Sequence, residues 1–389
     1  MMKLEMVGED DRVKAAAEDA HSGERALHEI LRDCGSVVVG YSGGVDSAYL
    51  AKAALDALGP ERVLAVTGRS PSYPEVQYRM AMRVVREIGL PHLEIETGEL
   101  DDPSYASNPR NRCYFCKTDL YRRLVAVARQ RGYRTVLDGS NADDPADHRP
   151  GLRAARELGV RSPLQEAGLT KAEIRELSRA HRLPTWDRPA APCLASRVVY
   201  GLPVTAERLG QVEVAEERLR GIRDWGDFRV RHHGPWARLE LPPGALPDLA
   251  EPGLRDRVAD ALRAAGFRRG CLDLRGYRRG ALNEVTGPAE GAQAGEQTPG
   301  TGERTPGTGD RTPAADGAVT AAELMMADGG DAASGESAGA VIQPAGPEDE
   351  IAVIRLAQIG PKGLADEARA RAIDKCRAAG YRYAALELF

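Results

Sequence analysis

A glycine-rich segment, Ser42-Gly43-Gly44-Val45-Asp46-Ser47, follows a β-branched run and opens a helical pattern. Two glycines allow a tight turn that points backbone N–H groups at an anion, and the helix N-terminus behind them adds partial positive charge. Asp46 is placed to hold Mg²⁺, and the serine hydroxyls can donate to phosphate oxygens. The segment contains no lysine, so it is not the loop that serves β/γ-phosphate chemistry. We predict a phosphate site formed by Ser42, Gly43, Gly44, Val45, Asp46 and Ser47.

Two later segments end predicted strands and fit the same site. Residues 67–70 end the second strand, where an open parallel sheet binds nucleotide. Residues 138–144 (DGSNADD) end a later strand, with carboxylates placed for Mg²⁺ or ribose. A polar turn held by its own Asx side chains is the alternative reading of that segment. We therefore add Thr67, Ser70, Gly139 and Asn141 to the ATP site.

Three cysteines have a spacing that suggests chemistry. Cys113-Tyr-Phe-Cys116 is a CxxC, which is compatible with zinc, redox or iron–sulfur sites, and Cys193 follows in the segment Ala-Pro-Cys-Leu-Ala-Ser-Arg. A zinc ribbon requires a second CxxC, which the chain lacks. Three thiolates with an open fourth position fit a cluster that binds an exchangeable ligand. The other cysteines, Cys34, Cys271 and Cys376, lie in apolar surroundings and are predicted to be buried.

Basic residues are frequent after these cysteines. Arg197, Arg229, Arg231 and Arg278 carry planar guanidinium groups suited to phosphate or carboxylate, although a solvated surface charge is the alternative for any one of them. Arg229 and Arg231 lie two residues apart on a predicted strand, so their side chains share a face. We expect these four arginines, together with Glu216, to contact the substrate.

Alternating strands and helices must position these residues. Short β-branched runs predict strands at 36–41, 62–67, 92–96 and 135–138, and helical periodicity predicts helices at 45–58, 75–88 and 117–131. Thr170 and Glu173 form a capping box for a further helix that ends near residue 181. This order predicts an α/β fold with a doubly wound parallel sheet.

The pattern changes at about residue 201. Helices are predicted at 205–223 and 254–265, and strands at 228–232, 237–241 and 270–274, which together indicate a second, smaller α+β domain. The C-terminal tail resembles part of this domain: RAAGYR at 377–382 aligns with RAAGFR at 263–268, and LEL at 386–388 aligns with LDL at 272–274. We interpret this as a repeated helix–turn–strand unit, with chance similarity as the alternative.

Between these parts, residues 286–350 are of low complexity, with a tandem heptad TPGTGER–TPGTGDR. Two arginines and twelve acidic residues give this segment a net charge of −10. Because the whole chain has a net charge of −5, the rest of the chain has a net charge of +5. Such a composition buries too little apolar surface to fold, so we expect disorder. The predicted organisation is therefore a leader or helix at 1–30, an ATP-binding domain at 31–200, the α+β domain at 201–285, the disordered insertion at 286–350, and a tail at 351–389 that packs on the second domain.

Composition also restricts the class of protein. No apolar run is long enough to span a membrane, and the charged N-terminal segment has no secretory h-region, so we expect a cytoplasmic protein without a membrane partner. Cysteine spacing in such a chain indicates metal binding or catalysis more than disulfides. The mild basic charge suits phosphorylated small molecules, and we expect no nucleic-acid partner.

With these residues identified, the chain resembles the ATP-dependent sacrificial sulfur transferases of nickel-pincer nucleotide biosynthesis (LarE type), within the pyrophosphatase-loop ATPases. The resemblance extends from about residue 36 to 284. It rests on GYSGGVDS, VTGRSPSYP, NRCYFCK, DGSNADD with HRPGL, VRSPL, PTWDRPAAPCLASRVVYG, RVRHHG with ARLE, and LDLRGYRRGALNE. SGGVDS is common to the superfamily, whereas PCLASR and GYRRGALNE are more specific. The implied fold is adenine nucleotide alpha-hydrolase-like.

The resemblance implies that each carboxylate of a pyridinium dicarboxylate mononucleotide is adenylated in turn and converted to a thiocarboxylate, with ATP and Mg²⁺. In one subgroup a cysteine matching Cys193 gives up its own sulfur and becomes dehydroalanine. In another, cysteines matching Cys113, Cys116 and Cys193 hold a [4Fe–4S] cluster that carries sulfide. Because all three cysteines are present, we expect the cluster-bearing kind. The expected catalytic residues are Cys193, Cys113, Cys116 and Asp46, and the expected sulfur donor is sulfide or cysteine-derived sulfur. We also expect a homo-oligomer.

Other classes remain open on the sequence alone. A tRNA thiolase of the same superfamily would bind bulk tRNA, and an ammonia-using synthetase of the NAD synthase type would not need Cys193. A non-enzymatic nucleotide sensor or iron–sulfur carrier would bind ATP without releasing pyrophosphate.

Overall fold

The computed structural model describes residues 9–144, 150–283, 341–345, 351–355, 366–378 and 383–388. These divide into two compact units, Met1–Val214 and Ala215–Phe389, which we describe separately. The predicted domain boundary at residue 200/201 lies earlier in the chain than this division, which falls within helix α9 (Ala206–Ile222). No helix in the described ranges combines the length and apolar character needed to cross a membrane.

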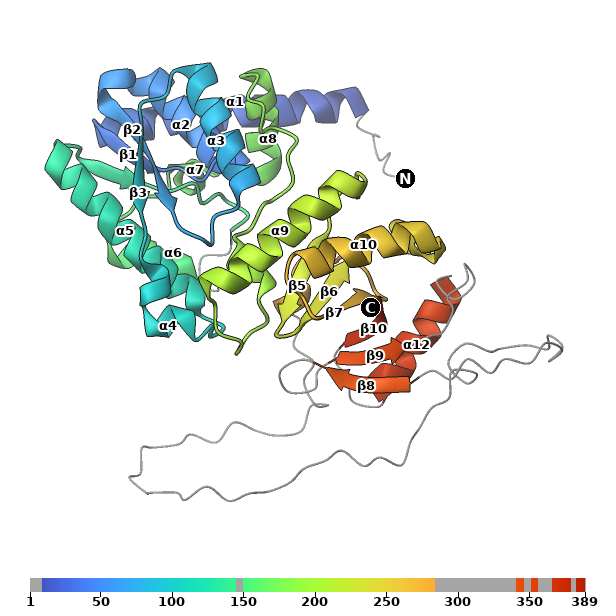
Figure 1. The fold of residues 1–389 in the computed structure, drawn as a ribbon. Coiled ribbons are helices and arrows are strands. Elements are labelled where there is room, and N and C mark those ends of the chain that lie inside the picture. Colours follow the sequence, from blue (N-terminus) through green and yellow to red (C-terminus); the bar gives the residue numbers. More distant parts are fainter. Residues whose placement is uncertain are drawn as a thin grey trace, which may run out of the picture. The chain divides into compact units, whose positions relative to one another are not determined.

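The first unit is built on a four-stranded parallel sheet of order β3-β2-β1-β4, which confirms the predicted parallel sheet. Its strands are β1 (Val37–Gly40), β2 (Val63–Arg69), β3 (His92–Glu96) and β4 (Thr135–Leu137). Its helices are α1 (Glu9–Cys34), α2 (Val45–Leu58), α3 (Glu75–Ile88), α4 (Pro103–Ala106), α5 (Arg112–Arg131), α6 (Pro150–Glu157), α7 (Pro163–Glu166) and α8 (Lys171–Ala180). Figure 1 shows the helices wrapped around this sheet.

Helices cover both faces of the sheet because the strands carry apolar side chains on both sides. Along β1, Val37 and Val39 pack in one cluster with residues of α1, α2, α3 and α8. Val38, between them, packs in a second cluster with residues of α5 and α6. This is the doubly wound arrangement that the sequence predicts.

Local signals set most of these elements. Gly44 is the N-cap of α2, and Gly89 ends α3 in the left-handed conformation. The Thr170–Glu173 capping box is formed and starts α8 at Lys171. One boundary differs from the prediction: α5 begins at Arg112 rather than at residue 117, so the CxxC lies on a helix and not in a loop.

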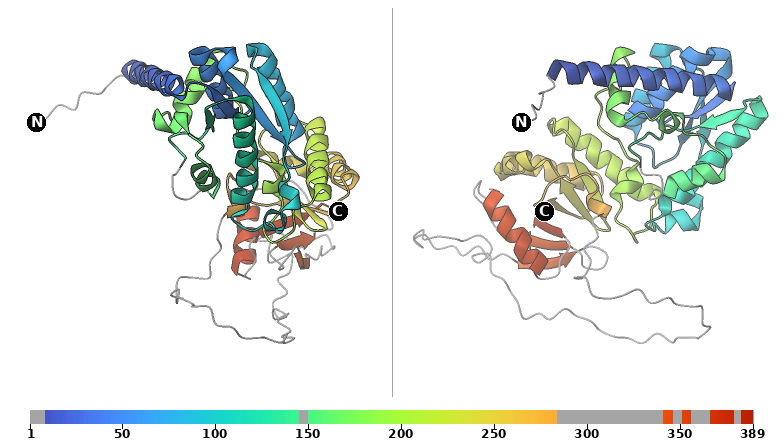
Figure 2. Two further views of the ribbon diagram at one scale, coloured as in Figure 1. Left: turned by 90° about the vertical axis from the view of Figure 1, so that its left-hand side faces the viewer. Right: turned by 180° about the vertical axis from the view of Figure 1, so that it is seen from behind.

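The second unit contains a six-stranded sheet of order β5-β6-β7-β10-β9-β8. Its elements are β5 (Arg229–His233), β6 (Trp236–Glu240), α10 (Pro252–Ala264), β7 (Arg269–Asp273), β8 (Val341–Ala345), β9 (Ile351–Arg355), α12 (Asp366–Ala378) and β10 (Tyr383–Glu387). The helix–turn–strand repeat is confirmed, because α12 and β10 follow each other as α10 and β7 do. Figure 2 shows the ribbon of this unit from two further sides.

One finding corrects the predicted insertion. Residues 341–345 were included in the segment 286–350, for which we predict disorder, yet they form β8 and pair with β9. Pairing with a neighbouring strand supplies the stabilisation that their local composition lacks. Apart from these five residues, the predicted insertion lies outside the described residues.

Candidate active site

The glycine-rich segment forms a compact loop between β1 and α2. The Ser47 hydroxyl lies 3.1 Å from the Ser42 hydroxyl, accepts from the Ser42 N–H at 3.2 Å and donates to the Gly44 carbonyl at 3.2 Å. Tyr73 Oη and Gln77 Nε2 donate to the Ser42 carbonyl at 2.8 and 2.7 Å. The loop is therefore held by its own two serines and by Tyr73 and Gln77, and the N-terminus of α2 follows it directly.

Glycine is required at the first of the two glycine positions. Gly43 has φ 66°, and a Cβ there would lie 2.4 Å from Ala81 Cβ on α3. Both the left-handed backbone and the close approach of α3 exclude a side chain. The local geometry thus supports the loop interpretation made from the sequence.

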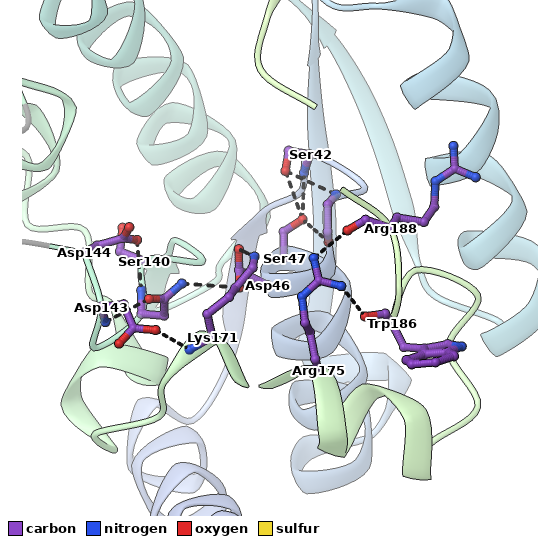
Figure 3. Close-up of polar contacts among 12 residues, drawn as sticks. Ser42, Asp46, Ser47, Ser140, Asp143, Asp144, Lys171, Arg175, Trp186 and Arg188 are labelled. Atoms are coloured by element: carbon purple, nitrogen blue, oxygen red, sulfur yellow. Dashed lines mark hydrogen bonds and ion pairs between the residues drawn. The ribbon is translucent and has the colours of Figure 1, made fainter. Parts of the chain in front are cut away.

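Asp46 is held by two side chains from distant parts of the chain (Figure 3). Lys171 Nζ donates to Asp46 Oδ2 at 2.5 Å, and Asn141 Nδ2 donates to Oδ1 at 3.3 Å. Asn141 was predicted in the nucleotide site, and the structure brings it to the loop. Lys171 was not predicted. It supplies beside the loop the cation that the SGGVDS segment lacks.

The position of Lys171 follows from the start of α8. Thr170 caps the helix, and the backbone N–H of Lys171 donates to Asp143 Oδ2 at 2.7 Å. The capping box in the sequence was the available signal, because it places Lys171 at the first helical position. The contact with Asp46 depends on packing between segments 125 residues apart.

The carboxylates of residues 138–144 accept hydrogen bonds both from their own turn and from other segments. Asp138 is buried and accepts from Tyr121 Oη at 2.8 Å, Ser162 Oγ at 2.7 Å and the Ser140 N–H at 3.1 Å. Asp144 accepts from the Asn141 N–H at 3.2 Å. The contact of Asp138 with the Ser140 N–H is that of the Asx-turn alternative, whereas those with Tyr121 and Ser162 tie the segment to the rest of the domain. Gly139 lies against α2, where an added Cβ would be 3.1 Å from the Ser47 nitrogen.

Thr67 and Ser70 lie at the end of β2, and their hydroxyls contact protein groups. Thr67 Oγ1 donates to the Tyr41 carbonyl at 2.9 Å and lies 2.9 Å from His92 Nε2. Ser70 Oγ donates to Glu99 Oε1 at 2.5 Å. Their predicted contact with ATP remains a prediction.

Helix α8 also supports the segment that leads to Cys193. Arg175, one turn after Lys171, donates to the carbonyls of Trp186 and Arg188, both at 2.7 Å (Figure 3). The segment is anchored again next to the cysteine, where the Leu194 N–H donates to the Ser72 carbonyl at 2.8 Å. One helix therefore positions both the phosphate loop and the start of the cysteine segment.

Arg197 stabilises the backbone around Cys193. Its Nη1 donates to the Pro192 carbonyl at 2.6 Å, to the Cys193 carbonyl at 3.1 Å and to Ser196 Oγ at 3.1 Å, and the residue is 3% exposed. These contacts indicate a positioning role. The substrate contact predicted for Arg197 is untested.

The three predicted cysteines lie in the first unit, Cys113 and Cys116 one turn apart on α5 and Cys193 just before the short helix Leu194–Arg197. Cys113 and Cys193 are exposed. Burial raises the pKa of the Cys116 thiol, and the negative charges of Glu99 and Cys193 raise it further. Cys34, Cys271 and Cys376 are buried, as predicted.

Glu99 was not identified from the sequence. It is 3% exposed, accepts from Ser70 and Ser72, and contributes to the raised pKa of both Cys116 and Tyr105. No local pattern marks it as part of a site. Within the described residues, no three His, Cys, Asp or Glu side chains are arranged to hold a metal ion. The cysteines match an iron–sulfur cluster in donor type, and a [4Fe–4S] cluster held by them remains a prediction.

Comparison with known proteins gives two kinds of match. The family model described as NAD synthase matches residues 23–127, which include the phosphate loop and the CxxC. An uncharacterised protein of Synechocystis sp. is 40% identical over 259 residues, which are 67% of this chain and 96% of that protein. An uncharacterised protein of Methanocaldococcus jannaschii is 26% identical over 242 residues, 62% of this chain and 90% of that protein.

A further relative is the pyridinium-3,5-bisthiocarboxylic acid mononucleotide synthase of Lactiplantibacillus plantarum, 36% identical over 260 residues, 67% of this chain and 93% of that protein. The chain belongs to the LarE family. The predicted resemblance and fold class are therefore confirmed, as is the enzyme class, ATP-dependent sulfur transfer, at the level of the family. These relatives are shorter than this chain, so a substantial part of it has no counterpart in them.

The remaining substrate residues predicted for this LarE-family chain lie in the second unit. Arg231 Nε and Nη2 contact Glu240 Oε2 at 2.9 and 2.8 Å, and Arg238 Nη1 lies 3.0 Å from Glu240 Oε1. Arg238 also pairs with Asp273, and Arg238, Glu240 and Asp273 are fully buried. We call Arg231, Arg238, Glu240 and Asp273 the buried ion network.

The other three residues surround this part of the sheet. Arg229 Nη1 donates to the Phe228 carbonyl at 2.6 Å and its guanidinium lies 5.0 Å from the Tyr277 ring centroid. Glu216 accepts from the Val230 N–H at 3.2 Å and pairs with Arg220. Arg278 Nη1 donates to the Gly276 carbonyl at 3.0 Å. Their substrate contacts remain predictions.

Proposed function

We propose that the chain adenylates the carboxylates of a pyridinium dicarboxylate mononucleotide and converts them to thiocarboxylates, as a cytoplasmic enzyme of nickel-pincer cofactor biosynthesis. The observation that supports this most directly is the contact of Asp46 with Lys171 beside the SGGVDS loop. The Lactiplantibacillus plantarum relative, which aligns with this chain over 93% of its own length, is named as a pyridinium-3,5-bisthiocarboxylic acid mononucleotide synthase, and that name describes the corresponding product.

In the first step a substrate carboxylate oxygen attacks the α-phosphorus of ATP, and the bond from that phosphorus to the bridging oxygen breaks. Pyrophosphate leaves with the electron pair. Backbone N–H groups of the loop and the N-terminus of α2 stabilise its charge. Lys171 adds a positive charge on the same side, and Asp46 would hold the Mg²⁺ that accompanies ATP.

In the second step sulfur attacks the acyl carbon and AMP leaves, with sulfide or cysteine as the original source of the sulfur. Cys193 is the proposed point of delivery because it is exposed and its backbone is fixed by Arg197. Cys113, Cys116 and Cys193 would together hold the proposed [4Fe–4S] cluster, which would supply a site for exchangeable sulfide. The sacrificial alternative requires only Cys193: its thiolate would displace AMP to form a thioester, and loss of the Cys193 α-proton with cleavage of the Cβ–Sγ bond would release the thiocarboxylate and leave dehydroalanine.

Arg197, Glu216, Arg229, Arg231 and Arg278 are the proposed substrate residues. Guanidinium groups match both the phosphate and the two carboxylates of such a substrate. Homo-oligomerisation is also part of the proposal, without an assigned interface.

The test is ATP/pyrophosphate exchange with and without the pyridinium dicarboxylate mononucleotide. We expect exchange that depends on this substrate, and thiocarboxylate formation when sulfide is added. The Cys193→Ala variant should retain exchange and lose the sulfur product. Because the NAD synthase model also matches, ammonia is the control nucleophile. Amide formation that persists in Cys193→Ala would contradict the proposal.

Iron content and mass distinguish the two routes of sulfur delivery. Anaerobically reconstituted protein should contain about four irons per chain if a [4Fe–4S] cluster forms, and should turn over repeatedly with sulfide. Each single change of Cys113, Cys116 or Cys193 to Ala should remove or destabilise the cluster. An iron-free protein whose Cys193 loses the mass of hydrogen sulfide after one turnover would instead establish the sacrificial route.

A further inference from the structure

The second unit contains the same ββαβ arrangement twice. The first repeat is β5-β6-α10-β7, and the second is β8-β9-α12-β10. In each, the first strand pairs antiparallel with the second, and the second pairs parallel with the third. The relation therefore extends well beyond the helix–turn–strand similarity visible in the sequence.

The strand registers of the two repeats also agree. Trp236 lies opposite Arg269 in the first repeat, and Ile351 lies opposite Tyr383 in the second. Helices α10 and α12 both have 13 residues, and β7 and β10 both have five. Matching lengths and registers indicate a tandem duplication rather than chance similarity.

The two repeats meet through equivalent strands. β7 and β10 pair antiparallel, with Leu272 opposite Leu386, and these are the first leucines of the aligned LDL and LEL segments. Antiparallel pairing of equivalent strands at equivalent residues is the geometry of a two-fold axis. The six-stranded sheet therefore resembles a homodimer whose two halves belong to one chain.

Only the first repeat carries the buried ion network. By the shared register, Arg231, Arg238 and Glu240 correspond to Gln343, Val353 and Arg355. Asp273 corresponds to Glu387, so the second repeat keeps one acidic position and has other residue types at the other three positions of the network.

The edge of β7 needs such a partner. Gly270, Cys271, Leu272 and Asp273 are buried, so without β10 this strand would leave backbone N–H and C=O groups unpaired beside apolar side chains. LarE-family relatives match 67% of this chain over nearly their whole length, so they are shorter than this chain.

We propose that the second repeat is a built-in pseudo-partner, which occupies within the same chain the β7 edge that a second copy of the first repeat would otherwise take. The β7 edge is self-complementary, since the partner it accepts is a copy of its own repeat. Any association of whole chains then uses another surface.

A cross-strand disulfide tests occupancy within one chain. Cys271 lies opposite Glu387, and the Leu388 N–H donates to the Gly270 carbonyl at 2.7 Å, so the adjacent residue pair is the hydrogen-bonded one. Cys271 and Glu387 therefore form a non-hydrogen-bonded pair, with Cα atoms about 4.5 Å apart, within the range of a disulfide. We expect oxidised Glu387→Cys protein to carry an intrachain bond and to run as a monomer on a non-reducing gel at every protein concentration.

The Glu387→Ser variant is the matched control, because it keeps the native cysteines and should form no such bond. Disulfide-linked dimers specific to Glu387→Cys would show that the repeat is exchanged between chains, and the proposal would be wrong. Two reduced thiols at these positions after oxidation would show that β7 and β10 do not pair, with the same consequence.

Self-complementarity is tested by cutting the folded full-length chain at a protease site inserted within residues 286–340. The two pieces should elute together at the mass of one chain. After separation in denaturant and refolding, the N-terminal piece alone should form a dimer in analytical ultracentrifugation, and added C-terminal piece should convert it to a one-to-one complex. An N-terminal piece that remains monomeric, or that does not take up the C-terminal piece, would overturn the proposal.

Discussion

Lys171 Nζ lies 2.5 Å from Asp46 Oδ2, although 125 residues separate them in the chain. Asp46 follows the two glycines of the phosphate loop, and Lys171 is the first residue of α8. The loop has no lysine of its own, so α8 contributes the positive charge from outside. In the proposed function, this contact gives helix α8 a role in adenylation.

Replacing Lys171 by Met should lower substrate-dependent pyrophosphate release at least tenfold, which corresponds to about 1.4 kcal/mol of transition-state stabilisation. The physical reason is the loss of a cation next to the leaving pyrophosphate. The matched control is Lys52→Met on α2, whose Nζ pairs with Asp56 at 2.5 Å on the surface. Equal rates for the two variants would remove Lys171 from the catalytic residues.

Replacing Asp46 by Ala should also lower pyrophosphate release at least tenfold, because it removes the proposed Mg²⁺ ligand. The double variant with Lys171→Met should lose less than the product of the two single effects, since the residues are in contact and act on the same phosphates. Pyrophosphate release is measured for all four proteins at several Mg²⁺ concentrations. Wild-type rates in Asp46→Ala would contradict the assignment.

The elements around this site were predictable because their signals are local. The bounds of α2, α3 and β3 agree with the sequence prediction, since apolar periodicity and flanking Gly or Pro determine them. Lys171 itself could be placed at a helix start from the capping box. Its direction toward Asp46 could not be predicted, because that contact depends on how α8 packs against α2.

Two other differences have similar causes. The sequence prediction begins the helix at residue 117 and leaves the CxxC outside it, whereas Arg112 to Cys116 belong to the same helix, which packs on the sheet. Residues 341–345 lie in a Gly- and Pro-rich neighbourhood and contain Pro344, so only pairing with β9 reveals them as a strand. Tertiary pairing in this case outweighs local propensity.

Replacing Arg175 by Ala should reduce sulfur transfer several-fold while pyrophosphate release stays near its wild-type rate. Arg175 donates to the Trp186 and Arg188 carbonyls, and losing both bonds loosens the segment before Cys193. Faster hydrogen exchange within residues 185–193 is the direct measurement. Arg179→Ala is the control, because Arg179 lies on the same helix and pairs with Glu176 on the surface. A parallel loss of both activities would argue against a role confined to the cysteine segment.

Replacing residues 286–340 by a short Gly/Ser linker should leave melting temperature and turnover almost unchanged. The entropy of loop closure grows only logarithmically with loop length, so a long low-complexity connection contributes little to stability. The replacement must end before Val341, because β8 pairs with β9. A matched deletion that continues through residue 345 should lower the melting temperature. A large loss with the shorter replacement would show that residues 286–340 contribute to the folded enzyme.

Arg229 and Arg231 should differ in what their loss affects, although the sequence predicts the same role for both. Arg231→Ala leaves Glu240 buried with one ion-pair partner fewer, and breaking a buried pair costs about 3–5 kcal/mol of unfolding free energy. Arg229 is not a member of the buried ion network and contacts the Phe228 carbonyl and the Tyr277 ring, so Arg229→Ala should mainly raise the KM for the pyridinium substrate and leave that for ATP unchanged. Urea unfolding and steady-state kinetics of both variants measure this separation.

Arg263→Ala, which removes an exposed pair with Asp260 on α10, is the control and should change neither the unfolding free energy nor the KM appreciably. If the KM for ATP rises in Arg229→Ala, that residue serves the nucleotide, and if Arg231→Ala is as stable as wild type, the buried ion network does not stabilise the second unit.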